Sequence, residues 1–312
     1  MIRTTLAAAL LTSSAFAYGH ELMNLDQLLK SAGWDFETAE IRTEKVTDRL
    51  HVLFGIGGNI AVSTGENGVL VVDDQFPQMI PKVMKAIGEL GGKDIDFAIN
   101  THWHFDHAEG NLVLGPQGTW LVSQRNSRDM MMGDHVVNLV TMRYAQKAYP
   151  KDALPHVTYD TTMQFHLNGE QIDLLHAGPA HTTGDTAVIF RTSNAVHLGD
   201  VFNNAGYPFI DADNGGDLTG VIRFCKAVLE EIDPQTVVIP GHGPITSREK
   251  LEAYVAMLET LRGRILELVK AGKTLEEVIA AKPTQDFDAE HGDPTNFVDR
   301  AYASLKREVA GS

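Results

Sequence analysis

Four side chains that can bind a metal ion lie within six positions of this sequence. They are His102, His104, Asp106 and His107, and they follow an apolar run over residues 95–100 that is typical of a short buried strand. Open α/β sheets bind their ligands on the loops at the C-terminal ends of strands. Adjacent imidazole and carboxylate groups pack poorly and stay unsatisfied without a cation. The spacing therefore predicts a metal site rather than a set of structural histidines.

Three further histidine or aspartate residues occupy similar positions much later in the chain. They are His181, Asp200 and His242, and each follows a strand-like apolar run and lies in a turn that contains glycine. A catalytic zinc takes three protein ligands and keeps one position for water. The early cluster therefore needs distant partners, and these residues are the candidates.

In these motifs the sequence resembles the metallo-β-lactamase superfamily, and the resemblance extends from about Thr43 to Leu268. It implies a first zinc site made by His102, His104 and His181. It implies a second site made by Asp106, His107 and His242. It also implies that Asp200 is the carboxylate that bridges the two metals, and that Asp73 is a structural aspartate near the site.

Strand and helix patterns alternate in two successive halves of the chain. This alternation predicts an α/β fold with two sheets and helices outside them, the four-layer αββα sandwich. Residues 1–17 are typical of a signal peptide, and residues 18–42 form an N-terminal segment. We assign residues 43–270 to the metallo-β-lactamase-like domain and residues 271–312 to a C-terminal helical extension.

The apolar periodicity also predicts individual elements. It indicates a helical region over residues 126–149 and one long helix over residues 248–270. Thr274 and the glutamates that follow it form a capping box at the start of another helix, and residues 286–290 are expected to form a loop. Cys225, the only cysteine, lies in an apolar helical pattern that predicts a packed core thiol.

The implied ligand set predicts a hydrolase with two metal ions. Seven ligands exceed the needs of one zinc, and imidazole with carboxylate suits zinc, with iron or manganese as alternatives. A metal brings the pKa of its bound water to about 7. The resulting hydroxide would attack a carbonyl carbon while the second metal stabilises the leaving group, and Asp106 would bind metal and orient the nucleophile. The expected substrate is a cyclic amide or ester, and β-lactam hydrolysis is one candidate.

Two other functions stay open. Related lactamases often carry cysteine or serine at the position of Asp200, so the carboxylate favours a lactonase or a glyoxalase-type thioesterase. A di-iron oxidoreductase is the third hypothesis, although the sequence contains no recognisable flavin-binding domain.

Five residues are candidates for contact with the substrate. Asn203 and Asn204 stand where lactamases of the cysteine type usually carry a lysine, and with Tyr207 they could donate hydrogen bonds to a carbonyl or carboxylate. The alternative is that these residues only shape their loop. Phe54 and Ile56 lie in the turn that corresponds to the substrate flap of β-lactamases, or they simply pack.

Charge and targeting patterns limit the partners. The formal net charge is −15, and an acidic surface repels nucleic acid and anionic membranes. Arg3, the apolar residues 6–11 and Ala15-Phe16-Ala17 are typical of a secretory signal, and the apolar run is too short for the alternative of a membrane anchor. We expect a periplasmic or secreted protein that acts on a small molecule and has no membrane span after signal cleavage. Its oligomeric state stays open.

Cleavage after Ala17 predicts that the protein recovered from its native host begins at Tyr18. N-terminal sequencing of the exported fraction measures this position directly. A soluble cytoplasmic protein that keeps Met1 would contradict the prediction.

Overall fold

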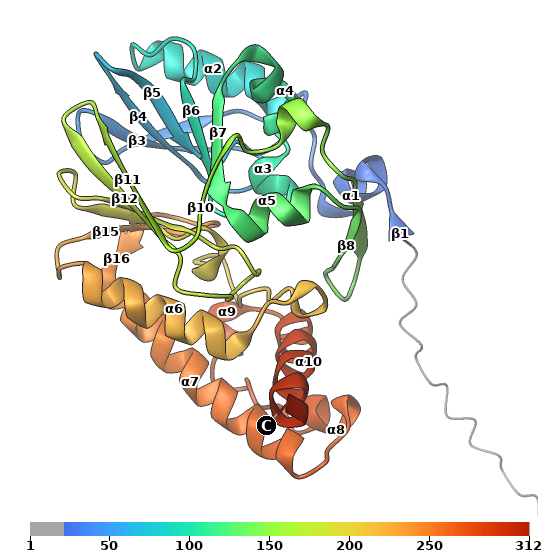
Figure 1. The fold of residues 1–312 in the computed structure, drawn as a ribbon. Coiled ribbons are helices and arrows are strands. Elements are labelled where there is room, and N and C mark those ends of the chain that lie inside the picture. The colour runs from blue at the N-terminus through green and yellow to red at the C-terminus, as the bar shows by residue number, and fades with distance from the viewer. Residues whose placement is uncertain (1–21, 312) are drawn as a thin grey trace, which may run out of the picture.

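The computed structural model describes residues 22–311, in which two β-sheets face each other and helices cover their outer sides (Figure 1). The predicted αββα sandwich is confirmed. The predicted signal peptide lies outside the described residues. Within residues 22–311, no helix has the length and the apolar character needed to cross a membrane.

The first sheet has seven strands in the order β10-β7-β6-β5-β4-β3-β2. They are β2 (Arg42–Lys45), β3 (Leu50–Phe54), β4 (Ile60–Gly65), β5 (Gly68–Val72), β6 (Phe97–Asn100), β7 (Trp120–Gln124) and β10 (Val157–Tyr159). Strands β2 to β5 pair antiparallel, whereas β5, β6, β7 and β10 pair parallel. Because parallel strands end at the same edge of a sheet, Asp73 after β5 lies beside the histidine cluster after β6.

The second sheet has six strands in the order β11-β12-β13-β14-β15-β16. They are β11 (Thr162–Leu167), β12 (Glu170–Leu175), β13 (Ala187–Phe190), β14 (Ala195–His197), β15 (Val237–Ile239) and β16 (Thr246–Ser247). Strands β14 and β15 pair parallel, so Asp200 and His242, which follow them, lie at one edge. His181 lies in the connection between β12 and β13.

Alternate side chains of the central strands enter two different cores. In β5, Leu70 lies between the sheets with Val188 of the second sheet. Its neighbours Val69 and Val71 face the outer side, where helix α2 (Ile80–Glu89) packs. Each such buried side chain contributes about 1.5–3 kcal/mol, so β5 is anchored on both faces. This anchoring holds the C-terminal edge of the sheet in place.

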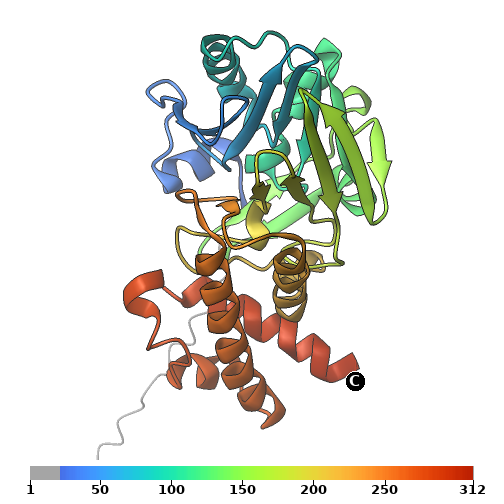
Figure 2. The same cartoon turned by 90° about the vertical axis from the view of Figure 1, so that its left-hand side faces the viewer.

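Helices α6 (Leu218–Glu231) and α7 (Arg248–Lys270) cover the outer face of the second sheet, and α10 (Thr295–Gly311) packs against both of these helices. Figure 2 shows α10, in red, crossing α7 below the sheets. The long helix predicted over residues 248–270 is confirmed as α7. Cys225 is fully buried in the α6 core, which agrees with a packed thiol, and burial raises the pKa of this thiol.

The predicted helical region over residues 126–149 is wrong beyond its first two turns. Helix α5 (Arg125–Met131) is followed by a hairpin of β8 (His135–Asn138) and β9 (Arg143–Gln146), and β1 (Leu22–Met23) pairs parallel with β9. The β-branched Val136 and Val137 favour a strand. Val140 turns the chain with a positive φ of 62°, which no helix continues. The apolar residues fitted both periods, so periodicity alone selected the wrong element.

The remaining elements are short. The helices are α1 (Leu25–Ala32), α3 (Phe105–Ala108), α4 (Asn111–Leu114), α8 (Leu275–Ala280) and α9 (Asp288–His291). Single 3-10 turns are η1 (Pro77–Met79), η2 (Gly115–Gln117), η3 (Lys151–Ala153), η4 (Gly199–Val201) and η5 (Ala212–Asn214). Thr274 and Glu277 form the predicted capping box of α8. The loop expected over residues 286–290 is partly wrong, because its second half forms α9.

Candidate metal centre

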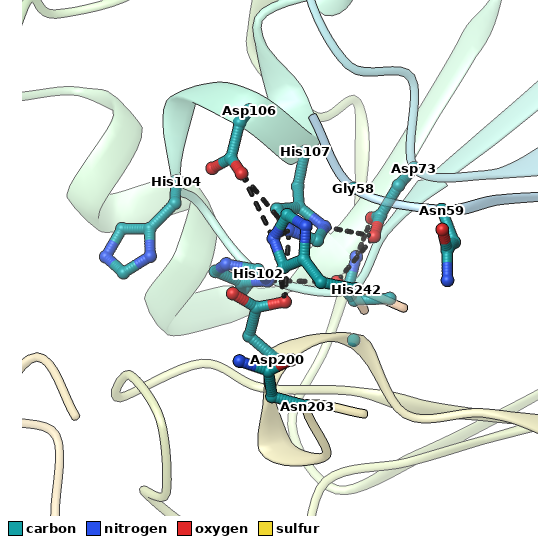
Figure 3. A network of polar contacts seen from close by, with 12 residues as sticks. Gly58, Asn59, Asp73, His102, His104, Asp106, His107, Asp200, Asn203 and His242 are labelled. Atoms are coloured by element: carbon teal, nitrogen blue, oxygen red, sulfur yellow. Dashed lines mark hydrogen bonds and ion pairs between the residues drawn. The ribbon is translucent and has the colours of Figure 1, made fainter. Parts of the chain in front are cut away.

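All seven candidate ligands converge where the ends of the two sheets meet. Figure 3 labels all of them except His181. The ligand atoms fall into overlapping groups whose members lie within 4.8 Å of one another. The groups are His102, His104 and His181; His102, His107 and Asp200; and Asp106, His107 and His242. These sets correspond to the two sites implied by the sequence, with Asp200 between them.

The loop after β6 presents its ligands in two ways. His102 lies in the bend that follows β6, and His104, the N-terminal cap residue of α3, has extended backbone. Asp106 and His107 lie in the single turn of α3, so successive side chains project in different directions. The change from extended to helical backbone lets one short segment serve both groups.

Two histidines of the first group direct unprotonated ring nitrogens at each other. His104 donates from Nε2 to Asp211 Oδ2 at 2.9 Å, and His181 donates from Nδ1 to the carbonyl oxygen of Phe209 at 2.9 Å. These acceptors select the tautomers in which His104 Nδ1 and His181 Nε2 carry lone pairs. The two atoms lie 2.9 Å apart. Two lone pairs at this distance repel unless a cation lies beside them, so the geometry fits a metal.

His102 also directs an unprotonated ring nitrogen at the centre. Its Nδ1 lies 3.0 Å from the hydroxyl oxygen of Thr101, whose own proton goes to Asp73 Oδ2 at 2.8 Å. His102 therefore donates outward from Nδ1 and directs Nε2 inward. This Nε2 atom is buried and has no hydrogen-bond partner. An orphaned, buried acceptor among other ligands is what a metal site requires.

The second group has the same construction. His107 donates from Nδ1 to Asp73 Oδ2 at 2.7 Å, which leaves Nε2 facing the other ligands. That Nε2 lies 3.2 Å from His242 Nε2. His242 Nε2 in turn lies 3.2 Å from Asp106 Oδ2. Two imidazoles and a carboxylate therefore surround one point.

Asp200 faces both groups with separate oxygens. Its Oδ1 lies 3.1 Å from His107 Nε2 and 3.4 Å from His242 Nε2. Its Oδ2 lies 3.8 Å from His181 Nε2 in the first group. A carboxylate with one oxygen toward each group has the orientation of a bridging ligand.

The electrostatics differ between the groups. Burial lowers the pKa of His102 well below its ordinary value and lowers the pKa of His181 to about 4, so both are neutral at pH 7. Burial is the largest single effect on His107 and His242 and acts against their charged forms, but Asp200 and the other nearby carboxylates together outweigh it. These carboxylates, Asp200 foremost, raise the pKa of His107 well above its usual range and that of His242 to about 10. A metal entering the second group must therefore displace protons, whereas these first-group histidines are ready to bind.

Asp73 supports ligands of both groups. Its φ of 65° is uncommon for a residue other than glycine, and the side chain is fully buried. Besides the bonds to Thr101 Oγ1 and His107, it accepts the backbone N–H of Thr101 at 2.7 Å. Asp73 thus orients the segment that carries the ligands, in the role expected of a structural aspartate.

The three polar candidates for contact with the substrate already have hydrogen-bond partners within the protein. Asn203 donates to the carbonyl oxygen of Tyr207 at 3.2 Å, and Asn204 donates to that of Pro244 at 2.8 Å. The hydroxyl of Tyr207 donates toward Asp288 in the C-terminal extension at 2.9 Å. A substrate that used these donors would have to replace bonds within the protein.

Phe54 precedes the turn over residues 55–58, and Ile56 lies within it. The guanidinium carbon of Arg42 lies 3.8 Å from the centroid of the Phe54 ring, and Ile56 packs against the core on the outer side of the first sheet. Their contact with a substrate stays a prediction.

Sequence reasoning missed two supports of the ligands. Asp211, the partner of His104, lies in a polar turn whose composition resembles any surface loop, and only its contact across 107 positions reveals it. Gly58 resembles an ordinary turn glycine in the sequence, but its N–H donates to the carbonyl oxygen of Asp106 at 2.9 Å. A Cβ atom at Gly58 would lie 2.2 Å from the ring of His107, so the backbone must approach closely there.

Gly58→Ala should therefore weaken the second group selectively. The added methyl group displaces the His107 ring, and we expect about a tenfold loss of second-site metal affinity together with a destabilisation of about 1–3 kcal/mol. Titration with zinc against a chromophoric chelator measures the affinity. Gly88→Ala on α2 is the matched control, since a Cβ there meets nothing within 4 Å. Equal affinities for Gly58→Ala and Gly88→Ala would show that close approach is not needed.

Comparisons with known proteins agree with this geometry. The sequence profile of the Metallo-beta-lactamase superfamily matches residues 55–249. A probable metallo-hydrolase of Methanocaldococcus jannaschii is 24% identical over 199 residues, which cover 62% of this chain and 92% of the relative. The alpha subunit of 2,4-dinitroanisole O-demethylase from a Nocardioides strain is 22% identical over 256 residues, covering 80% of this chain and 72% of the relative.

Among solved structures, a metallo-beta-lactamase from Pontibacter korlensis shares the fold with a TM-score of 0.59 and 16% identity, over 70% of this chain and 99% of the other. The profile match spans both halves of the sandwich and includes all seven candidate ligands. Six of these ligands lie either in loops at the shared edge or in the short helix α3. The chain belongs to the metallo-β-lactamase superfamily, whose related metallo-hydrolases support an enzymatic role.

Proposed function

We propose that this protein is an exported hydrolase with two zinc ions that attacks the carbonyl of a cyclic amide or ester. The observation that carries the proposal is the orientation of Asp200, with one oxygen toward each ligand group. A centre for one metal would need neither the second group nor a shared carboxylate. Two divalent ions close together need an anion between them, because their mutual repulsion is otherwise uncompensated.

The exposure of the ligands indicates the side from which a substrate arrives. The side chains of His102, His107 and His181 are fully buried, whereas those of His242, Asp200 and Asp106 retain 27%, 14% and 12% of their exposure. Among the ligands, these three are the most exposed, so a substrate is expected to approach the centre from their side. The two carboxylates therefore lie between solvent and the buried imidazoles.

Bound zinc would supply a water that is acidic enough to act as a nucleophile near neutral pH, together with positive charge for the developing oxyanion. The chain supplies the orientation. Asp106 lies on the exposed side of the second group and can accept a proton from the attacking water. The fixed tautomers of His102, His104 and His181 keep the first group rigid, so little reorganisation accompanies the reaction.

The negative charge of Asp200 also indicates which class of substrate the centre would accept. A carboxylate bridge adds negative charge, and no lysine or arginine occurs between Asp200 and Arg223 to hold a substrate carboxylate. This composition favours uncharged lactones, or thioesters, as the second candidate class beside β-lactams. The O-demethylase relative adds an aryl methyl ether as a fourth probe. A panel of these four compounds tests the reaction class directly.

Asp200→Asn keeps the shape of the side chain but removes its charge. We expect weaker metal binding in the second group and a loss of roughly 10²-fold or more in turnover, mostly in kcat. Asp200→Cys should retain the second metal, because a thiolate is also a good zinc ligand. Metal content and rates on a lactam and a thioester measure both effects.

The matched control is Asp94→Asn, which makes the same chemical change at an exposed aspartate before β6. It should leave metal content and rates unchanged. An Asp200→Asn protein that keeps two metals and near wild-type rates would show that Asp200 only ends a strand.

A further inference from the structure

The segment over residues 211–217, here called the Asp211 turn, lies against two ligands of the first group. Asp211 accepts the proton of His104, as described above. The backbone N–H of Asp211 donates to the carbonyl oxygen of His181 at 3.0 Å. Gly216 approaches the same carbonyl oxygen so closely that a Cβ atom would lie 2.3 Å from it. The position of this turn therefore determines how both histidines are oriented.

The Asp211 turn has little regular structure of its own. Its only element is the single 3-10 turn η5, and Asn214 holds the Asp211 carboxylate with its amide at 2.9 Å and 3.0 Å. So short a 3-10 segment does not define a rigid position by itself. External contacts must hold it, and the structure supplies them from the C-terminal helix and from β8. In β8, Asn138 donates to Asp213 Oδ2 at 2.8 Å, and the carbonyl oxygen of Val136 accepts from Asn214 at 2.9 Å.

Helix α10 directs a polar face at the Asp211 turn. Arg300, Ser304 and Arg307 are four and three positions apart, so they share one side of the helix. Arg307 donates from its two terminal nitrogens to the carbonyl oxygens of Ala212 and of Gly216, the latter at 2.5 Å. One guanidinium thus closes the turn from both ends.

The other two residues fix the same turn. Ser304 donates to Asp217 Oδ1 at 3.2 Å and accepts the backbone N–H of Leu218 at 3.1 Å. Arg300 forms an ion pair with Asp213 at 2.8 Å. The polar face therefore contacts the turn at its start, its middle and its end.

The residues that pack α10 into the core differ from those that contact the turn. The helix is held by apolar residues that lie in the core with α6 and α7, namely Phe297, Val298, Ala301 and Leu305. Arg307 lies outside this core and is exposed to solvent. Removing its guanidinium should therefore leave the helix in place and release only the turn.

We propose that α10 supports the first metal site by holding the Asp211 turn in place. In this proposal, Arg307 is a positioning residue for His104 and His181 and acts through that turn. The proposal rests on the proposed function only in requiring that the three-histidine group binds a metal. Outer-shell partners of metal ligands typically change metal affinity 10–100-fold. Arg307 acts one step further out, so we expect an effect near the lower end of this range.

The test compares Arg307→Met with Arg307→Lys and with Lys306→Met in the full-length chain. Lys306 is exposed on the same helix, its ammonium lies over the ring of Tyr302, and Lys306→Met removes the same charge away from the turn. Zinc titration against a chromophoric chelator gives stepwise affinities. His104→Ala and His242→Ala identify which step belongs to which site.

Arg307→Met should weaken the first site about tenfold and leave the second site within about twofold. Arg307→Lys should fall between wild type and Arg307→Met, because one ammonium can serve only one carbonyl well. Lys306→Met should match wild type. Cobalt substituted at the first site should show an altered visible spectrum in Arg307→Met alone.

Unchanged first-site affinity in Arg307→Met would overturn the proposal. Equal weakening of both sites would also overturn it, because α10 would then act only through general packing. A different result would contradict the proposed function. A wild-type protein that binds a single metal at the three histidines would refute the two-metal hydrolase, while the effect of Arg307→Met on that metal would still decide the role of α10.

Discussion

The site is built around ligand side chains that are held close together. Ring nitrogens that carry lone pairs face each other across 2.9 Å in the first group, and buried carboxylates lie against imidazoles in the second. Burying the first group without a cation is costly, because its ring nitrogens lose their hydration and repel each other. In the second group, protons on His107 and His242 offset the carboxylates until a metal displaces them. The outer nitrogens of His102, His104, His107 and His181 are fixed by acceptors, so these four rings cannot relieve the contact by changing tautomer or turning away. A cation is the only partner that satisfies all of them.

The scaffold reinforces this arrangement from several directions. The parallel end of the first sheet presents Asp73, which holds ligands of both groups. The parallel pair in the second sheet presents Asp200 and His242. Glycines over residues 57–58 bring the backbone against the second group, and the Asp211 turn supports the first. Support therefore comes from both sheets and from the C-terminal helix, which lies outside the region matched by the family profile.

How far the sequence predicts this site follows from the range of the interactions. The ligands were predictable because chemically distinctive residues follow apolar strands at short spacing. The sandwich was predictable from alternation of elements. Asp211 was not, because its meaning depends on a contact with His104 far along the chain. The hairpin after α5 was mispredicted because Val136 and Val137 sit among methionines that fit either period, and local pattern cannot separate a strand from a helix there.

The most direct test of the two-metal centre is the number of metal ions per chain. The purified protein is saturated with zinc, freed of excess metal and analysed by mass spectrometry of its elements against an amino-acid determination of protein. The geometry predicts two ions per chain, mainly zinc, because each group offers three ligands and Asp200 faces both. One ion per chain under saturating conditions would contradict it.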